Sequence, residues 1–128
     1  MKIVNLTPHK IRIIKEEDCE RLSVWEYDSL GSIRVREEIE EVGEIEGIRI
    51  IRKRFSDVSD KDIRKLKEIL RDKNTIIIVS LLAGKYLKTD ERLTEEEKRR
   101  IFIIGNTVRN DRGEIVGADA LTNIMDLG

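Results

Sequence analysis

The chain has 128 residues, of which 39% are hydrophobic and 40% are charged, and its 25 basic and 26 acidic residues leave a formal net charge of −1. A chain of this length is expected to form a single domain over residues 1–128, with a core of its own. Because the charges cancel, the composition predicts no general attraction to nucleic acid or to acidic membranes.

The cysteine content and the apolar runs predict a cytoplasmic protein. Cys19 is the only cysteine, so no internal disulfide can form, and its acidic neighbours argue against a reactive thiol. The start of the chain lacks the apolar stretch of a signal peptide, and the run 76–84 is about half as long as a membrane-spanning helix of ~20 residues. The absence of glutamine, with abundant Glu, Lys, Arg and Ile, predicts a thermophilic source.

The N-terminal stretch VNLTPHK holds the only proline and the only histidine. Pro8 has a fixed φ that suits the second position of a turn, so residues 7–10 are predicted to form a four-residue turn. The flanking segments would then pair as a hairpin, with Leu6 opposite Ile11 and both side chains on one face.

The next segments are predicted to be a polar loop at residues 15–18, a short strand at 22–25 and a hairpin over residues 32–55. Its first strand alternates apolar and charged residues as a half-exposed strand does. Gly43 and Gly47 bracket the turn of this hairpin.

Helices and strands alternate in the second half of the chain. Ser59 and Thr94 each open a capping box, and Ser80 is a natural helix cap after the β-branched run 75–79. Residues 48–104 therefore read strand, helix, strand, helix, strand, which favours parallel strands joined by crossovers. A hairpin turn at residues 110–113 follows. The predicted fold is α/β, a single-domain mixed sheet with flanking hairpins and two to three helices.

The strand-to-helix junction at Ser80 is the first candidate site. In open α/β sheets, ligands gather beyond the carboxyl ends of the parallel strands, where a helix N-terminus favours an anion. The alternative is that Ser80 only caps the helix. No Gly-rich phosphate loop and no G-x-S-x-G sequence is present, so a standard nucleotide fold or hydrolase elbow is not supported.

His9 is the second candidate, because its unperturbed pKa lies near neutrality and it could act as a general acid or base or as a ligand. The alternative is an exposed imidazole, with Asn5 and Thr7 only satisfying the backbone of the turn. One histidine and one cysteine do not make a zinc site, so no metal and no cofactor are predicted, although a carboxylate-only Mg²⁺ site stays open. The basic residues at 49–54 and 98–100 are interpreted as ion-paired surface rather than a nucleic-acid patch.

Three stretches resemble a known family. NLTPH, VSLLAG and VRNDRGEIVGADAL occur in the same order as similar segments in a family of small, uncharacterised prokaryotic and phage-borne proteins. This chain departs from the family pattern at Ala118, where the family often has Cys. The resemblance implies no reaction, and it implies that these positions are characteristic: Asn5, Thr7, Pro8, His9, Ser80, Arg109, Gly113 and Gly117.

These observations lead to two main hypotheses about function. The first is a cytoplasmic accessory protein that binds a small anionic ligand, such as a nucleotide or phosphate compound, in a polar pocket formed by Asn5, Thr7, His9, Ser80 and Arg109. The second is a non-catalytic interaction protein, for example a homodimer, that uses an exposed apolar edge of the 33–55 hairpin or Trp25. An enzymatic interpretation, with His9 as base and Arg109 as electrostatic stabiliser, ranks below both.

Overall fold

The computed structural model describes residues 1–17 and 21–128, and the side chains of residues 1–15 and 24–128. Along the chain the elements are β1 (Lys2–Asn5), β2 (Ile11–Glu17), β3 (Arg21–Tyr27), β4 (Val35–Ile45), β5 (Ile48–Val58), α1 (Asp60–Leu70), β6 (Thr75–Ile78), α2 (Leu81–Lys88), α3 (Glu95–Lys98), β7 (Ile101–Arg109), β8 (Ile115–Asn123) and the 3₁₀ turn η2 (Ile124–Asp126).

The fold is a mixed α/β structure, as predicted, with a six-stranded sheet in the order β1-β6-β7-β8-β2-β3 and a separate two-stranded sheet of β4 and β5. Within the large sheet β1, β6 and β7 run parallel, as do β2 and β8. β7 pairs with β8, and β2 with β3, in antiparallel fashion. The order strand, helix, strand, helix, strand is confirmed over residues 48–104, but β5 pairs with β4, and the parallel neighbour of β6 on that side is β1.

The N-terminal hairpin predicted from the sequence is wrong. The chain does bend at residues 7–9, but β1 pairs with β6 and β2 with β3 and β8, so Leu6 and Ile11 are not cross-strand partners. The loop predicted at residues 15–18 is also wrong up to residue 17, because β2 continues to Glu17; Asp18 lies outside the described residues. Pairing with β3 holds these charged residues in the strand despite their low strand propensity.

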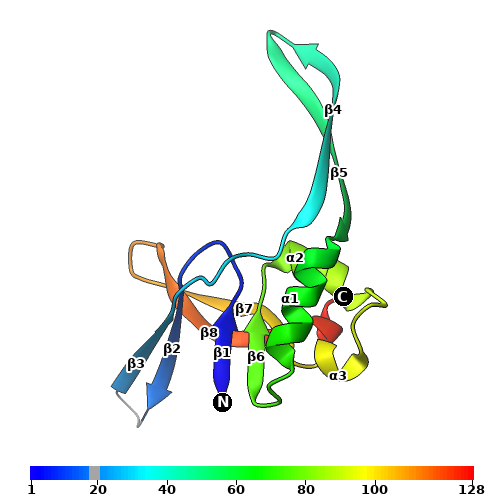
Figure 1. The fold of residues 1–128 in the computed structure, drawn as a ribbon. Helices are drawn as coiled ribbons and strands as arrows, with labels where there is room; N and C mark the ends of the chain where they lie inside the picture. The colour runs from blue at the N-terminus through cyan, green and yellow to red at the C-terminus, as the bar shows by residue number, and fades with distance from the viewer. Residues whose placement is uncertain (18–20) are drawn as a thin grey trace.

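Helices α1 and α2 cover one face of the large sheet (Figure 1). Amphipathic spacing buries Ile63, Leu66 and Leu70 of α1 against the sheet. Ser59, Ser80 and Thr94 cap the three helices as predicted, and Thr94 forms a complete capping box with Glu97. These helices and the strands beneath them form the main core, which also contains the sheet residues Val4, Ile77, Ile101 and Ile103.

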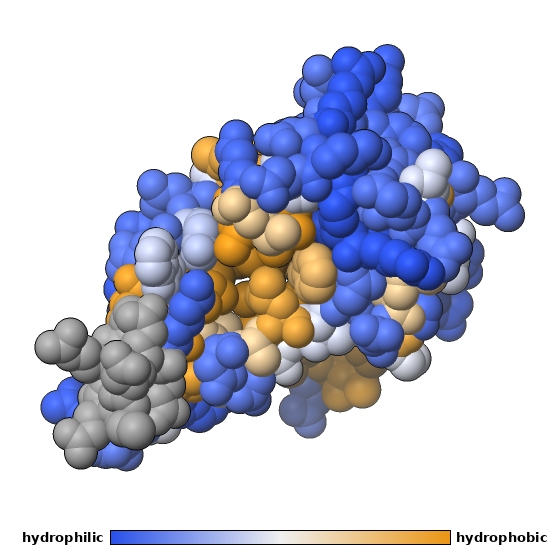
Figure 2. All heavy atoms as spheres, turned by 90° about the horizontal axis from the view of Figure 1, so that it is seen from below, coloured by the Kyte–Doolittle hydropathy of each residue, from blue (hydrophilic) through white to orange (hydrophobic). Residues whose placement is uncertain are grey.

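A smaller set of apolar residues is buried on the other face of the large sheet. Ile11, Ile78 and Ala118 are buried on this side, outside the helix-side core. At the end of the molecule opposite the β4–β5 hairpin, apolar side chains gather around a hollow (Figure 2).

The antiparallel pair β4 and β5, here called the ribbon, projects from the body of the molecule (Figure 1). Every residue from Arg36 to Asp57 is exposed, whereas Val58, at the base of the ribbon, is buried in the core. Glu46 and Gly47 form the tip with positive φ values of 50° and 81°.

Arg92 holds the base of the ribbon. Its guanidinium donates to the Val58 carbonyl oxygen at 2.6 Å, to Asp60 Oδ1 at 2.7 Å and to Asp90 Oδ2 at 2.6 Å. The end of β5, the start of α1 and the segment after α2 are thereby joined through one side chain. The hydrogen bond from Arg92 lowers the pKa of the Asp90 carboxyl from its ordinary 3.8, against the opposing effect of burial.

This contact predicts an acid-sensitive contribution to stability. Because the folded-state pKa of Asp90 lies below its unfolded value, the stabilisation is complete above pH 3.8 and is lost as the pH falls through the folded-state pKa. Asp90→Asn is expected to lower the free energy of unfolding by about 1–2 kcal/mol at neutral pH, an amount reduced because Arg92 is partly exposed to solvent. In urea titrations the difference from the unsubstituted chain should shrink below pH 4. The neighbouring exposed carboxylate supplies the control Glu91→Gln, and an equal loss in both variants at every pH would contradict the assignment.

Candidate functional site

The side-chain amide of Asn5 lies at the carboxyl end of β1 and is fully hydrogen-bonded within the protein. Asn5 is 1% exposed. Its Nδ2 donates to the carbonyl oxygens of His9 at 2.8 Å and Tyr27 at 2.9 Å. Its Oδ1 accepts from the backbone N–H of Thr7 at 2.9 Å and lies 2.7 Å from the Thr7 hydroxyl. These contacts use both donors and both lone pairs of the amide.

The same region joins the two edges of the large sheet. The backbone N–H of Leu30, after β3, donates to the Asn5 carbonyl oxygen at 2.9 Å, and the N–H of Ile33 donates to the Leu6 carbonyl oxygen at 3.2 Å. The Ser29 hydroxyl donates to the Thr7 carbonyl oxygen at 2.5 Å. Because β1 and β3 are the outermost strands, Asn5 and its neighbours close the sheet at this end.

Thr7 and His9 contribute to this closure in different ways. The Thr7 hydroxyl lies within hydrogen-bonding distance of both Asn5 Oδ1 and the His9 carbonyl oxygen, at 2.7 and 2.9 Å, and its single proton serves one of them at a time. His9 is exposed, and it is its backbone carbonyl that takes part in the network.

Ser80 follows β6, the strand next to β1, at the end of the sheet where both strands finish. Leu6 N–H donates to the Ile78 carbonyl oxygen at 2.9 Å, so the parallel strands β1 and β6 end side by side. The Ser80 hydroxyl accepts from the N–H of Ala83 at 3.3 Å, which is the capping contact expected from the sequence. The chain segments that lead to His9 and to Ser80 therefore leave the sheet from neighbouring strand ends.

Arg109 lies in the hairpin of β7 and β8. It ends β7, is exposed, and donates through Nη1 to the Gly113 carbonyl oxygen at 2.6 Å, across the turn of the β7–β8 hairpin. Of the five predicted site residues, the structure groups Asn5 and Thr7 in one hydrogen-bond network, to which His9 adds its carbonyl. Ser80 lies at the adjacent strand end, and Arg109 is held within its own hairpin.

A cavity of about 310 Å³ lies elsewhere, between β1, β6, α1 and the segment before the ribbon. Its floor is apolar, and its polar lining includes Lys2, Lys65, Glu68 and Asp72. None of the five predicted residues lines it. The sequence contains a usable signal for this cavity, because residues 65 and 68 lie at helical spacing on one face of α1 and Asp72 follows two residues after the helix.

Thr75 is the buried polar residue of this cavity, with 1% of its surface exposed. Its hydroxyl makes no hydrogen bond of ordinary geometry among the described residues. It still lies near enough to Asp72 to help the N–H of Asn74 lower the pKa of that carboxyl. With two ammonium and two carboxylate groups in its lining, this cavity has no single sign of charge.

No cluster of three or more His, Cys, Asp or Glu side chains that could hold a metal ion occurs among the described residues. Within the same part of the chain, no helix is both long and apolar enough to cross a membrane. Comparison of the chain with protein-family models, with curated proteins and with solved structures found no match.

The hydrogen bonds of Asn5 predict a large structural cost for its removal. Asn5→Ala would leave the partly buried carbonyl oxygen of Tyr27 and N–H of Thr7 without the Asn5 amide, and we expect the free energy of unfolding to fall by about 2–4 kcal/mol in chemical denaturation. Asn106→Ala is the matched control, because Asn106 is exposed and bonds to Asp119 on the surface. Equal stability of the two variants would mean that the Asn5 amide is not needed for folding and is free for another role.

Proposed function

We propose that this chain is an interaction protein that associates with further copies of itself through the β4–β5 ribbon. The supporting observation is the apolar surface of the ribbon. Seven of its large apolar side chains are more than one-third exposed, from 37% for Phe55 to 69% for Ile48. The set is Ile39, Val42, Ile45, Ile48, Ile50, Ile51 and Phe55.

A ribbon with this much exposed apolar surface is expected to be covered by a partner. A two-stranded hairpin is at best marginally stable in water, and contiguous exposed apolar side chains mark interaction sites. A second copy of the chain brings a ribbon with the same apolar side chains and the same balance of charges. Association would therefore cover the apolar residues of both copies at once.

The apolar residues occupy both faces of the ribbon. Ile39, Ile51 and Phe55 share one face. In the cross-strand pairing Phe55, Lys53 and Ile51 lie opposite Glu37, Ile39 and Glu41, and every second residue of a strand points to the same side. The register shifts between Glu41 and Gly43, and beyond it the apolar pair Ile45 and Ile48 lies on the opposite face.

The test is the mass of the chain in solution. We expect a mass above the 14.9 kDa of one chain in light scattering and sedimentation velocity. The double variant Ile45→Ser, Ile48→Ser should weaken self-association by about tenfold or more in Kd, since the loss of about 1.4 kcal/mol of apolar contact gives a factor of ten. Ile115→Ser is the control, because Ile115 is 57% exposed but lies on β8.

A chain that sediments as a monomer at every concentration would contradict the proposed function. Equal weakening by the ribbon variant and by Ile115→Ser would show that association does not depend on the ribbon.

Binding of a small anionic ligand is a second candidate function. The observation that favours it is that β1 and β6 end side by side, close to Ser80 at the N-terminus of α2. The test is to add phosphate or a nucleoside triphosphate to the protein in increasing concentration and to measure the melting temperature at each concentration. A rise in melting temperature that is reduced by both His9→Ala and Ser80→Ala, and kept by Arg112→Ala in the β7–β8 turn, would support this function. The absence of any rise would argue against it.

The proposed setting is the cytoplasm of a heat-adapted organism. A lone cysteine suits a reducing compartment, and exposed ion pairs such as Lys10–Glu26, Arg99–Glu95 and Arg71–Glu68 fit a thermophilic protein. Membership of the phage-borne family with the NLTPH opening is likewise a proposal that rests on the quoted motifs.

A further inference from the structure

We infer that the ribbons join edge to edge and head to tail, with β4 of one copy beside β5 of the next, in an assembly of more than two copies. This inference rests on the proposed function and specifies how the copies meet. The observation that carries it is the separation of charge between the two strands of the ribbon.

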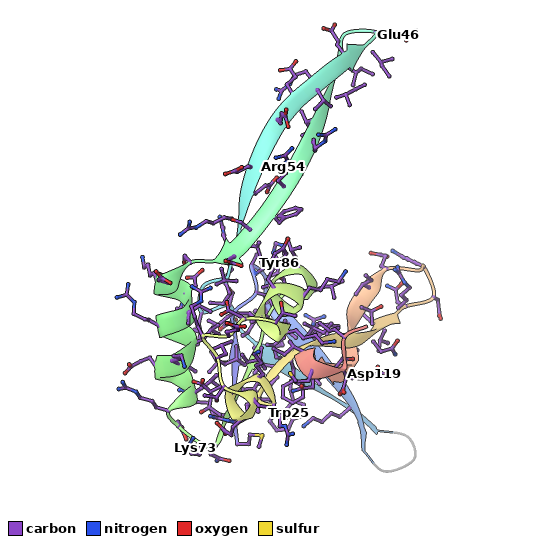
Figure 3. The ribbon with its side chains drawn as sticks, turned by 90° about the vertical axis from the view of Figure 1, so that its right-hand side faces the viewer. Trp25, Glu46, Arg54, Lys73, Tyr86 and Asp119 are labelled. Atoms are coloured by element: carbon purple, nitrogen blue, oxygen red, sulfur yellow. The ribbon has the colours of Figure 1, made fainter. Side chains whose placement is uncertain are left out.

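Acidic and basic side chains are sorted by strand. β4 carries five glutamates and a single arginine, whereas β5 carries three arginines, a lysine and a single aspartate. One long edge of the ribbon is therefore acidic and the other is basic. Figure 3 shows these side chains spreading outward along the ribbon, with Arg54 near its middle and Glu46 at its tip.

Both edges are available for strand pairing. β4 and β5 have 11 residues each, and among the described residues their sheet contains no other strand. The outer N–H and C=O groups of each strand form a template onto which another strand can add. No proline interrupts either strand.

The cross-strand pairs within the ribbon show which edges match. Glu38 lies opposite Arg54, and Glu40 lies opposite Arg52. If neighbouring ribbons point the same way, β4 of one runs antiparallel to β5 of the next, so the same pairs of opposite charge can recur between copies. Within the ribbon Arg54 forms an ion pair with the diagonal neighbour Glu40. Both side chains are exposed, at 64% and 57%, so this ion pair contributes little stability and can be exchanged for one with a neighbouring copy.

A two-fold contact between like edges is disfavoured. Pairing β4 with β4 places glutamates opposite glutamates, and pairing β5 with β5 places arginines opposite arginines, which is destabilising. Edge addition also brings the side chains of both faces beside those of the neighbour, so the apolar residues near the base and near the tip are covered together. A head-to-tail contact does not close in two copies, and it leads to a ring or a filament.

Charge reversal distinguishes these arrangements. The acid-reversed variant is Glu38→Lys with Glu40→Lys, which puts basic side chains on both strands at the 38–54 and 40–52 pairs. The base-reversed variant is Arg52→Glu with Arg54→Glu, which puts acidic side chains on both strands at the same pairs. We expect each variant alone to sediment near the 14.9 kDa of one chain. Mixing the two should restore the large assembly, because positions 38 and 40 of each variant then meet opposite charges at positions 52 and 54 of the other.

Two controls separate the assembly from a damaged ribbon. A chain with all four substitutions keeps opposite charges across its own ribbon and should assemble alone. The exposed body residues supply matched changes of net charge, Glu91→Lys with Glu114→Lys and Arg71→Glu with Arg112→Glu, and these should leave the mass unchanged.

The outcomes also separate this inference from the proposed function. Two results would overturn the head-to-tail arrangement and leave self-association through the ribbon intact. The first is a strict dimer. The second is an assembly whose mass falls with the double variant Ile45→Ser, Ile48→Ser but not with either charge reversal. Failure of the mixed variants to assemble, when the four-substitution chain does assemble, would also overturn it. A monomer in every preparation would contradict both proposals.

Discussion

The fold depends on the side-chain amide of one buried residue, Asn5. Its four hydrogen-bonding positions join the end of β1 to the bend after it and to the end of β3. Buried amides are costly unless every group is paired, so this residue both requires and enforces the curvature that brings the edges of the sheet together. The bend around Pro8 is thereby explained without any role for a ligand.

The closure at Asn5 also fixes the path of the chain into the ribbon. The segment after β3 is tied to β1 through Leu30 and Ile33, and the chain enters β4 only two residues later. On the return, Arg92 holds Val58 at the end of β5. A ribbon that is exposed along most of its length thus leaves the body from two anchored points.

Local patterns in the sequence predicted the helices, strands and helix caps well. They did not predict which distant segments pair with one another. The caps at Ser59, Ser80 and Thr94 depend on neighbouring residues only, and all three are confirmed. The hairpin predicted around Pro8 is wrong because a turn does not determine which strand its flanks pair with, and β6 competes for β1 through an uncharged β-branched run. The role of Asn5 depended on the carbonyl of Tyr27, 22 residues away, which no local pattern indicates.

The direct junction between the ribbon and α1 has a mechanical consequence. Only Ser59 separates the last residue of β5 from the first residue of the helix, and that serine is itself held as the cap of α1. Eleven extended residues span roughly 35 Å, so the ribbon acts as a stiff spacer whose angle is set by the helix. In the edge-to-edge assembly proposed above, the length of this one hairpin would set how far the tips stand from the row of bodies.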